Sequence, residues 1–561
     1  GATVTLTQGT GANVVIPNGG IRMVASDGAG SGAAVTDVLD VLGGTGNVGL
    51  GSGAFGTGLT TGTDNVAIGE NAGDALTTGS DNTFVGDNAG GAATTGSNNI
   101  AVGSGALDLE DAGTDSVAIG HNALTTQNAD GANHNVAIGS SAGGAITSAT
   151  QNTLVGGLSG DALTDGAANT AFGFETLTAD TRGNNNVAIG HHALSTQNFT
   201  TVTAAYNVAV GSQAGLANTT GTNNTFIGGL AGTANTTAIN NVAVGRNALT
   251  ATTTGGLNTA IGTYALAANT TATNNVAVGT SALEANTTGA SNTAVGSGAL
   301  DANTTASNNT AVGTSALGAN TTGHSNVAVG QDTLSANTTG QENTALGSQA
   351  LKTNSTASNN VAIGRQTMYA NTTGTSNTAV GAYALDANTT ADDNTAVGYN
   401  AATTNTTGTN NAAFGAYALG LNTTGSQNTA IGRSSLYQNT TASNNTAVGT
   451  SALNANTTGD TNVAVGKDSM LANTTGTNNT AVGARSLQAN TTAANNVAVG
   501  DLALGANTTG HSNVAVGTST MAANTTGSEN TAVGYLALDA NTTAENNVAI
   551  GRLAGTGLTT G

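Results

Sequence analysis

The sequence predicts an all-β fold, a parallel β-solenoid that follows a small N-terminal β cap. From Gly211 onward the motif N-(T/V)-A-(V/I)-G-x-x-A-L-x-A-N-T-T-(G/A)-x-(N/S) recurs without insertion or deletion, so that its glycine falls at Gly211, Gly228, Gly245 and onward to Gly551. The 561 residues also include 83 glycines but only 7% charged and 3% aromatic residues, far from the usage of a globular chain. A short fixed period is the signature of stacked coils that share one continuous core, and the sequence has room for about 30 coils of mostly about 17 residues each.

Three zones follow one another along the chain. Residues 1–45 lack the motif and contain the only proline, Pro17, beside the turn dipeptide Asn18-Gly19; we expect a cap or attachment module that covers the first coil. Residues 46–210 carry looser copies, with extra residues at 128–134 and 198–206 that we expect to form loops. Residues 211–561 are the strict array. At about 4.8 Å per coil, 30 coils predict a shaft on the order of 140 Å long.

Each coil is predicted to contain one short strand at positions 1–5, where position 1 is Asn292 in one representative coil. Position 3 is nearly always Ala and position 4 nearly always Val or Ile, so both faces of the strand are apolar or small. We expect the core to consist of position 4 and of the leucine at position 9. Glycine at position 5 is expected either to adopt a positive φ or to allow a close backbone approach at the corner after the strand. The core residues predicted in two representative coils are Val295, Leu300, Val312 and Leu317.

Asparagine recurs at position 12 and near position 1 of the strict coils. Asparagines stacked at one spacing form amide ladders, in which each side chain bonds the copies above and below it. We therefore assign these residues a structural role. The predicted ladder residues include Asn286, Asn303, Asn320, Asn337, Asn371 and Asn388.

One coil contains too little apolar surface to offset the conformational entropy that is lost when its residues become ordered. Hydrogen bonds between coils and burial of the second face of the strand must supply the rest. This favours self-association through the Ala-rich face, and a homotrimer is the simplest closed arrangement.

Several function classes are disfavoured by composition. Nine basic residues against 30 acidic ones give a net charge of −21, which repels nucleic acid. No apolar run approaches the roughly 18 residues of a membrane span. No cysteine is present, and no G-x-S-x-G, H-E-x-x-H or Walker sequence occurs. We expect neither an enzyme nor a bound cofactor.

Metal binding is also disfavoured. Of six histidines only His191 and His192 are adjacent, and we expect the side chains of such neighbours to point apart. One acidic cluster lacks the spaced pattern of a calcium loop, and we expect it to be a solvated loop. Its members are Asp108, Glu110, Asp111 and Asp115.

Positions 6, 7 and 10 vary freely and collect charges and tyrosines, which marks them as the outward surface. Tyrosine among Asn, Thr and Asp is compatible with carbohydrate contact as well as with simple solvation. The repeated Asn-Thr-Thr also matches a glycosylation acceptor, and a column of threonines matches an ice-binding surface. The candidate surface-contact tyrosines are Tyr264, Tyr383, Tyr399, Tyr417 and Tyr535.

Two likenesses to known families follow from the motif. The S-V-A-I-G and N-V-A-I-G sequences at 116–120 and 135–139 resemble coils of trimeric autotransporter adhesin heads, which are left-handed parallel β-rolls in homotrimers. The sequence N-T-A-V-G at 292–296, followed by A-L at 299–300 and N-T-T at 303–305, resembles the arrays of bacteriophage tail fibres and other virion fibres. This second likeness extends over roughly residues 46–561.

The fibre resemblance implies a structural shaft in a virion that supports attachment to the host surface. Its N-terminus would bind other virion or cell-surface structural proteins, and a host-surface glycan or protein is a candidate contact. The alternatives are a bacterial extracellular adhesin head or surface filament subunit, and an ice-binding solenoid.

Overall fold

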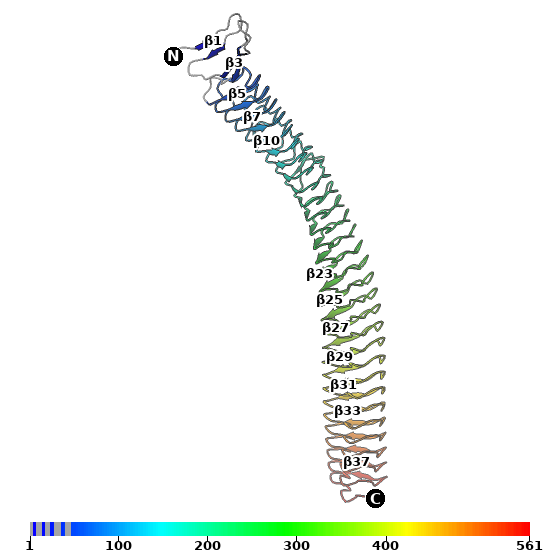
Figure 1. The fold of residues 1–561 in the computed structure, drawn as a ribbon. Helices are drawn as coiled ribbons and strands as arrows, with labels where there is room; N and C mark the ends of the chain where they lie inside the picture. The colour runs from blue at the N-terminus through cyan, green and yellow to red at the C-terminus, as the bar shows by residue number, and fades with distance from the viewer. Residues whose placement is uncertain (1–3, 7–13, 17–22, 27–34, 40–45, 561) are drawn as a thin grey trace. The chain divides into compact units, whose positions relative to one another are not determined.

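A computed structural model describes residues 4–6, 14–16, 23–26, 35–39 and 46–560, and it confirms the parallel β-solenoid (Figure 1). These described residues form strands and turns and include no helix. The chain divides into two compact units, residues 1–275 and 276–561, each of which is described by itself.

The N-terminal zone contains two antiparallel strand pairs. Strand β1 (Val4–Leu6) pairs with β2 (Val14–Ile16), and β3 (Met23–Ser26) pairs with β4 (Val35–Leu39). The predicted turn at Asn18-Gly19 and its neighbour Pro17 lie outside the described residues. The capping role of this zone stays a prediction.

In unit 1 each coil contributes one three-residue strand to a parallel ladder. The register is in phase with the motif: Ala118 of one coil lies between Ala101 and Ala137 of its neighbours. Two additional parallel pairs flank the ladder, β9 (Gly113–Thr114) with β11 (Gly131–Ala132) and β15 (Gly183–Asn184) with β17 (Thr203–Ala204). The ladder strands are β5 (Val48–Leu50), β6 (Val66–Ile68), β7 (Thr83–Val85), β8 (Ile100–Val102), β10 (Val117–Ile119), β12 (Val136–Ile138), β13 (Thr153–Val155), β14 (Thr170–Phe172), β16 (Val187–Ile189), β18 (Val208–Val210), β19 (Thr225–Ile227), β20 (Val242–Val244) and β21 (Thr259–Ile261).

Unit 2 is one uninterrupted ladder of strict coils, so its described part extends over roughly 80 Å at the usual spacing of about 4.8 Å. Its strands are β22 (Val276–Val278), β23 (Thr293–Val295), β24 (Thr310–Val312), β25 (Val327–Val329), β26 (Thr344–Leu346), β27 (Val361–Ile363), β28 (Thr378–Val380), β29 (Thr395–Val397), β30 (Ala412–Phe414), β31 (Thr429–Ile431), β32 (Thr446–Val448), β33 (Val463–Val465), β34 (Thr480–Val482), β35 (Val497–Val499), β36 (Val514–Val516), β37 (Thr531–Val533) and β38 (Val548–Ile550).

The core of a coil is made of alanine and leucine. Ala294 at position 3 is fully buried, as are Leu300 and Leu317 at position 9. The prediction that Val295 and Val312 belong to the core is wrong, because Val295 is 36% exposed and Val312 is also only partly buried. Neighbouring side chains of a strand point to opposite faces, so once position 3 faces inward, positions 2 and 4 face outward.

The same alternation corrects the expectation about the Ala-rich face. The alanine column is inside each coil and therefore cannot contact another chain. The valine and isoleucine at position 4 lie on the opposite, outward face of the strand.

Glycine at position 5 is required by a close backbone approach. Gly296 has φ +137°, and a Cβ added there would lie 2.5 Å from the carbonyl oxygen of Gly313 in the next coil. The predicted positive φ at this corner is therefore confirmed. Three further positions are left-handed without being glycine, as Ser315, Leu317 and Asn308 show with φ values of +55°, +53° and +62°.

Two buried asparagine ladders run through the strict array. At position 12, Asn303 Nδ2 donates to Asn286 Oδ1 at 2.8 Å and to the carbonyl oxygen of Ala306 at 3.0 Å. At position 1, the backbone N–H of Asn309 donates to Asn292 Oδ1 at 3.0 Å. The predicted ladder residues Asn320, Asn337, Asn371 and Asn388 occupy the same places, and Asn354 joins Asn337 to Asn371.

Where position 3 carries a large side chain, glycine at position 9 makes room for it. Phe84 replaces the usual alanine, and position 9 is Gly73 in the preceding coil and Gly90 in its own coil. A Cβ on Gly73 would lie 2.8 Å from the Phe84 ring, and one on Gly90 would lie 2.6 Å from it. One phenyl ring thus fills the space of leucines in two coils. Phe226 and Leu154 are flanked by glycines in the same way.

We predict that Phe84→Ala leaves a cavity and lowers the free energy of unfolding by about 3–5 kcal/mol. Gly90→Leu alone overpacks the core beside Phe84. The double variant restores the Ala–Leu arrangement of other coils, and Leu107 shows that leucine tolerates the φ of this position, +54°. Denaturant unfolding followed by circular dichroism should therefore show two destabilised single variants and a double variant with part of the loss recovered, because the space beside Gly73 stays empty. Additive losses would contradict this account.

Candidate interaction surfaces

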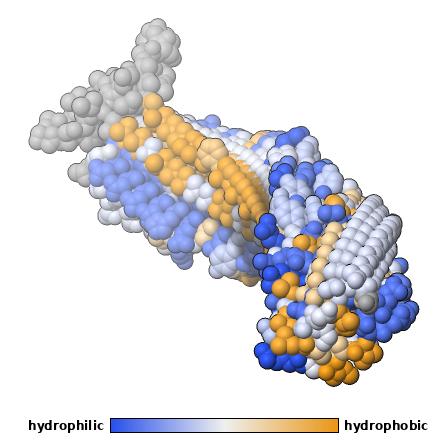
Figure 2. All heavy atoms as spheres, turned by 90° about the horizontal axis from the view of Figure 1, so that it is seen from below, coloured by the Kyte–Doolittle hydropathy of each residue, from blue (hydrophilic) through white to orange (hydrophobic). Residues whose placement is uncertain are grey.

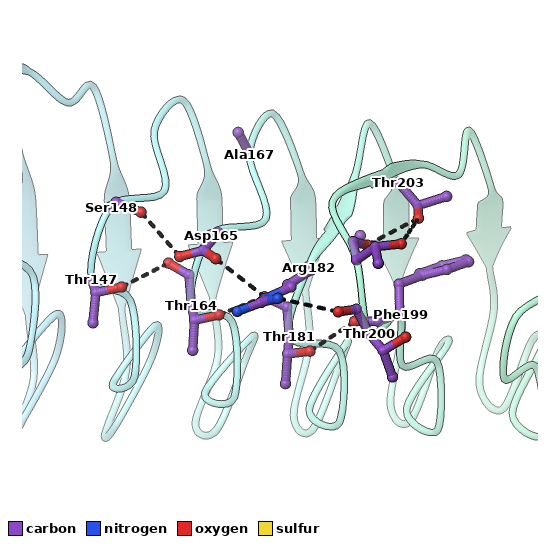
Figure 3. Close-up of polar contacts among 12 residues, drawn as sticks. Thr147, Ser148, Thr164, Asp165, Ala167, Thr181, Arg182, Phe199, Thr200 and Thr203 are labelled. Carbon is purple, nitrogen blue, oxygen red and sulfur yellow. Dashed lines mark hydrogen bonds and ion pairs between the residues drawn. The ribbon is translucent and has the colours of Figure 1, made fainter.

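The inserted loop at 198–206 is tethered to the coils beside it (Figure 3). Thr181 Oγ1 donates to the carbonyl oxygen of Phe199 at 2.9 Å, and Arg182 Nη1 donates to that of Thr200 at 3.2 Å. The Nε atom of Arg182 also lies 3.3 Å from Asp165 Oδ2. These contacts hold the loop against the solenoid.

A buried carboxylate lies beneath each inserted loop. Asp180 is fully buried; its Oδ2 accepts from Gln197 Nε2 at 2.6 Å and its Oδ1 accepts from the N–H of Gly183 at 3.0 Å. Glu110 is also fully buried and accepts from Gln127 Nε2 at 2.7 Å. Both acids occupy position 12, where the strict coils have asparagine.

Sequence reasoning missed this role of Glu110 and Asp180. The signal is an acid at position 12 that is followed by glutamine at the same position of the next coil, directly before each insertion. The two glutamines rejoin the asparagine ladder, since Gln127 Oε1 accepts from Asn135 and Gln197 Oε1 accepts from Asn207. An acid–glutamine pair therefore continues the ladder beside each of the two inserted loops, at 128–134 and 198–206.

Burial raises the pKa of the Glu110 and Asp180 carboxyls above their ordinary values, although hydrogen bonds from the glutamines and from backbone N–H groups act in the opposite direction.

The other members of the predicted acidic cluster do not gather into one site. Asp111 accepts from the Thr94 hydroxyl, and Asp115 accepts from Asn98 Nδ2 at 3.2 Å. Within the described residues, no three His, Cys, Asp or Glu side chains are grouped so as to hold a metal ion.

The histidine pair differs from the expectation. The rings of His191 and His192 lie 3.8 Å apart, centroid to centroid, instead of pointing away from each other. His192 adopts φ +57° at the corner, so the strict alternation of a strand does not apply there. Phe174 stacks on His191 at 5.9 Å, and His192 Nδ1 lies 3.1 Å from Glu175 Oε2.

An apolar column covers the outward face of the strands, and we call it the outer stripe. It consists of position 4 of each ladder strand, which is Val, Ile, Leu or Phe throughout the described ladders. Ile363, Phe414 and Ile431 are 39%, 40% and 42% exposed, and Phe172 is 57% exposed. Figure 2 shows hydrophobic residues gathered into elongated bands on the face in view. The stripe is never interrupted by a charge.

The candidate tyrosines fall into two groups. Tyr383, Tyr399 and Tyr417 contact one another in consecutive coils. Tyr264 and Tyr535 each lie beside an arginine instead, with Tyr264 OH 3.4 Å from Arg246 Nη1 and Arg552 Cζ 5.8 Å from the centre of the Tyr535 ring.

The threonine and asparagine columns are largely occupied by the fold. Thr304 Oγ1 donates to the carbonyl oxygen of Thr321 at 3.2 Å, so of each Thr-Thr pair only the second residue, such as Thr305, is exposed. The asparagine of each Asn-Thr-Thr, such as Asn303, is fully buried with its amide in the ladder. A glycan at that asparagine would break the ladder.

No protein-family model matches the chain, and no curated protein is detectably similar to it in sequence. The described residues contain no helix of the length and apolarity needed to cross a membrane.

We predict that Gln197→Met destabilises the coils around the second insertion by about 1–3 kcal/mol at pH 7, because Asp180 loses a donor and Asn207 loses an acceptor. Burial holds the folded-state pKa of Asp180 above its unfolded value, so charging this group opposes folding above that pKa and has no effect below the unfolded value. The loss should therefore shrink as the pH falls through the raised pKa.

Amide hydrogen exchange of residues 180–207, followed over a series of decreasing pH values from 7, measures this local stability. Gln151→Met, at an exposed position of the same unit, is the matched control and should change little. A loss that stays constant at every pH down to the ordinary aspartate pKa would show that the Asp180 carboxyl plays no part.

Proposed function

We propose that this chain is the shaft of a bacteriophage tail fibre or related virion appendage, a homotrimeric structural protein that supports attachment to a host surface. The observation that carries the proposal is the outer stripe. In a single copy, a continuous column of aliphatic and aromatic side chains is partly exposed to solvent, and contiguous exposed apolar surface of this kind is typical of an interface.

The distribution of charge supports self-association through this stripe. The chain has 30 acidic residues, yet positions 2 and 4 carry none in the described ladder strands. Copies of a chain with net charge −21 repel one another, so an interface must lie where charges are absent. A stripe that repeats identically in every coil is suited to a closed cyclic assembly such as a trimer.

The structural role is supported by how the side chains are used. The buried polar groups of the strict coils, such as Asn337 and Asn371, are bound in ladders, and those of the loop-bearing coils pair acid with glutamine. The resemblance of the N-T-A-V-G and N-T-T sequences to virion fibre arrays supports the fibre assignment. In this proposal the chain is not an enzyme and binds no cofactor. Other virion proteins bind the N-terminal zone, and a host glycan or protein is a further contact.

A bacterial surface adhesin or filament subunit is the second candidate. The inserted loops favour it, because Val202 and Tyr206 are 60% and 57% exposed in the second loop. Exposed apolar side chains on a tethered loop are suited to protein contact. The ice-binding alternative has less support, because the exposed threonines form a single column beside charged positions such as Glu342 and Asp393.

We predict that light scattering of the intact chain gives the mass of a trimer, about 160 kDa from a chain of 53.5 kDa. A double variant of the outer stripe, Ile363→Asp with Ile431→Asp, should give the monomer mass, since each charge would be buried without a partner. Thr356→Asp with Thr424→Asp, on the exposed threonine column of the same unit, should leave the trimer unchanged. A monomeric native protein with an intact circular dichroism spectrum would overturn the assembly.

We further predict that an antibody raised against residues 276–561 labels purified virions in immunogold microscopy. Labelling confined to the surface of bacterial cells would instead establish the adhesin alternative. An antibody absorbed with the purified protein is the control for specificity.

A further inference from the structure

Five of the eight tyrosines of the chain lie between residues 369 and 437. Four of them come from consecutive coils and touch: Tyr383, Tyr399, Tyr417 and Tyr437, which we call the tyrosine ridge. Their ring centroids are 6.2, 5.5 and 6.1 Å apart in that order, and each pair meets edge to face at interplanar angles of 84°, 87° and 85°. The ridge is thus continuous across four coils.

Neighbouring residues make room for the ridge. Tyr383 and Tyr417 stand at position 7, each directly after an alanine, whereas Tyr399 stands at position 6 in the coil between them. Gly420 leaves space for the last ring, because a Cβ there would lie 2.8 Å from two carbons of Tyr437. Small residues beside the tyrosines therefore leave space for the edge-to-face packing of their rings.

Polar groups surround the rings. Arg365 Cζ lies 5.5 Å from the centre of the Tyr383 ring at one end, and Arg433 occupies position 6 of the coil that contributes Tyr437 at the other. Among positions 6, 7 and 10 of the coils within residues 364–437, Asp386 is the only acidic residue. On these columns the four ridge phenols are accompanied by two guanidinium groups, Arg365 and Arg433, and by a single carboxylate.

Stabilisation of the solenoid does not require the ridge. The other coils of unit 2 have mostly Ser, Thr, Asn, Gln or charged residues at these columns and form the same ladders. Tyr399 is 48% exposed, so nearly half of its surface makes no contact in a single chain. The other three ridge tyrosines are partly buried. An exposed aromatic ring supported by neighbouring rings and arginine forms the type of surface in which binding energy concentrates.

We propose that the tyrosine ridge is a binding site for a saccharide chain that lies along the solenoid. The C–H faces of sugar rings pack on aromatic rings, and their hydroxyls accept from guanidinium groups and bond with phenols. Each of the four coils contributes one aromatic ring, 5.5–6.2 Å from the next, so a chain that lies along the solenoid can contact one ring per coil. The inference extends the proposed function by giving a glycan contact a place on the shaft, and it can fail separately, because a shaft without the site would still assemble.

Two tyrosines provide a matched comparison for the test. Tyr399 and Tyr535 both occupy position 6 and both are 48% exposed, but only Tyr399 contacts other tyrosines. The chain has no tryptophan, so tyrosine fluorescence reports directly on these rings. The intact protein is first applied to an array of bacterial surface polysaccharides and oligosaccharides, and the strongest ligand is then titrated at up to millimolar concentration.

The expected result is saturable quenching or enhancement of tyrosine fluorescence. Tyr399→Ala should weaken binding about tenfold or more, the loss typical of a central interface residue, while Tyr535→Ala should stay within about twofold of the native protein. Arg365→Met should weaken binding less than Tyr399→Ala. Light scattering of each variant should give the native mass.

Three results would overturn the inference. They are no binding to any saccharide on the array, an equal loss in Tyr399→Ala and Tyr535→Ala, and a smaller assembly mass for Tyr399→Ala, which would place the ridge in an interface between copies.

Discussion

The constraint on which the rest of this structure depends is the constant register between neighbouring coils. A buried asparagine can donate to the equivalent asparagine of the adjacent coil only if equivalent residues stack directly above one another along the solenoid. In the ladder from Asn286 to Asn388 every link spans 17 residues. The two inserted loops occur where Glu110 or Asp180, each with its glutamine, continues the hydrogen bonding across the join. The insertions occur where the ladder can be repaired.

The register also explains a backbone that local preferences disfavour. Positions 7, 9 and 17 are left-handed in coil after coil although they are Ser, Leu or Asn, and such a conformation costs roughly 1–2 kcal/mol for an L-residue. Leu317 shows what offsets this cost: its side chain is fully buried and its N–H donates to the carbonyl oxygen of Thr333 in the next coil at 3.0 Å. An isolated coil would have the strain without these contacts, so stability here belongs to the stack.

The fold was predictable from the sequence because period and ladder residues are repeated many times, whereas the direction of individual side chains was not. Val295 and Ala294 are both apolar, and nothing in one coil says which of them faces inward. The structure shows that alanine at position 3 packs beside leucine or methionine at position 9, and that Phe84 takes the place of alanine because Gly73 and Gly90 vacate the space. The contacts of the candidate site residues were harder to predict from the sequence than the fold. The packing of the tyrosines depends on the position that each occupies in its coil and on the size of its neighbours, and only the folded corner defines how these lie.

The uniformity of the outer stripe has a consequence for assembly. A column that repeats in every coil would make nearly the same contacts if one copy slid along its partner by one coil, just as a featureless strand permits register slips. If the stripe joins copies as proposed, its periodic part supplies affinity but cannot define alignment. Alignment must come from residues that break the period. Phe172 and Phe414 are the two aromatic residues on the stripe, and the coils around Phe172 also carry the tethered loops. The irregular coils of unit 1 are therefore suited to setting the register that the strict array then extends.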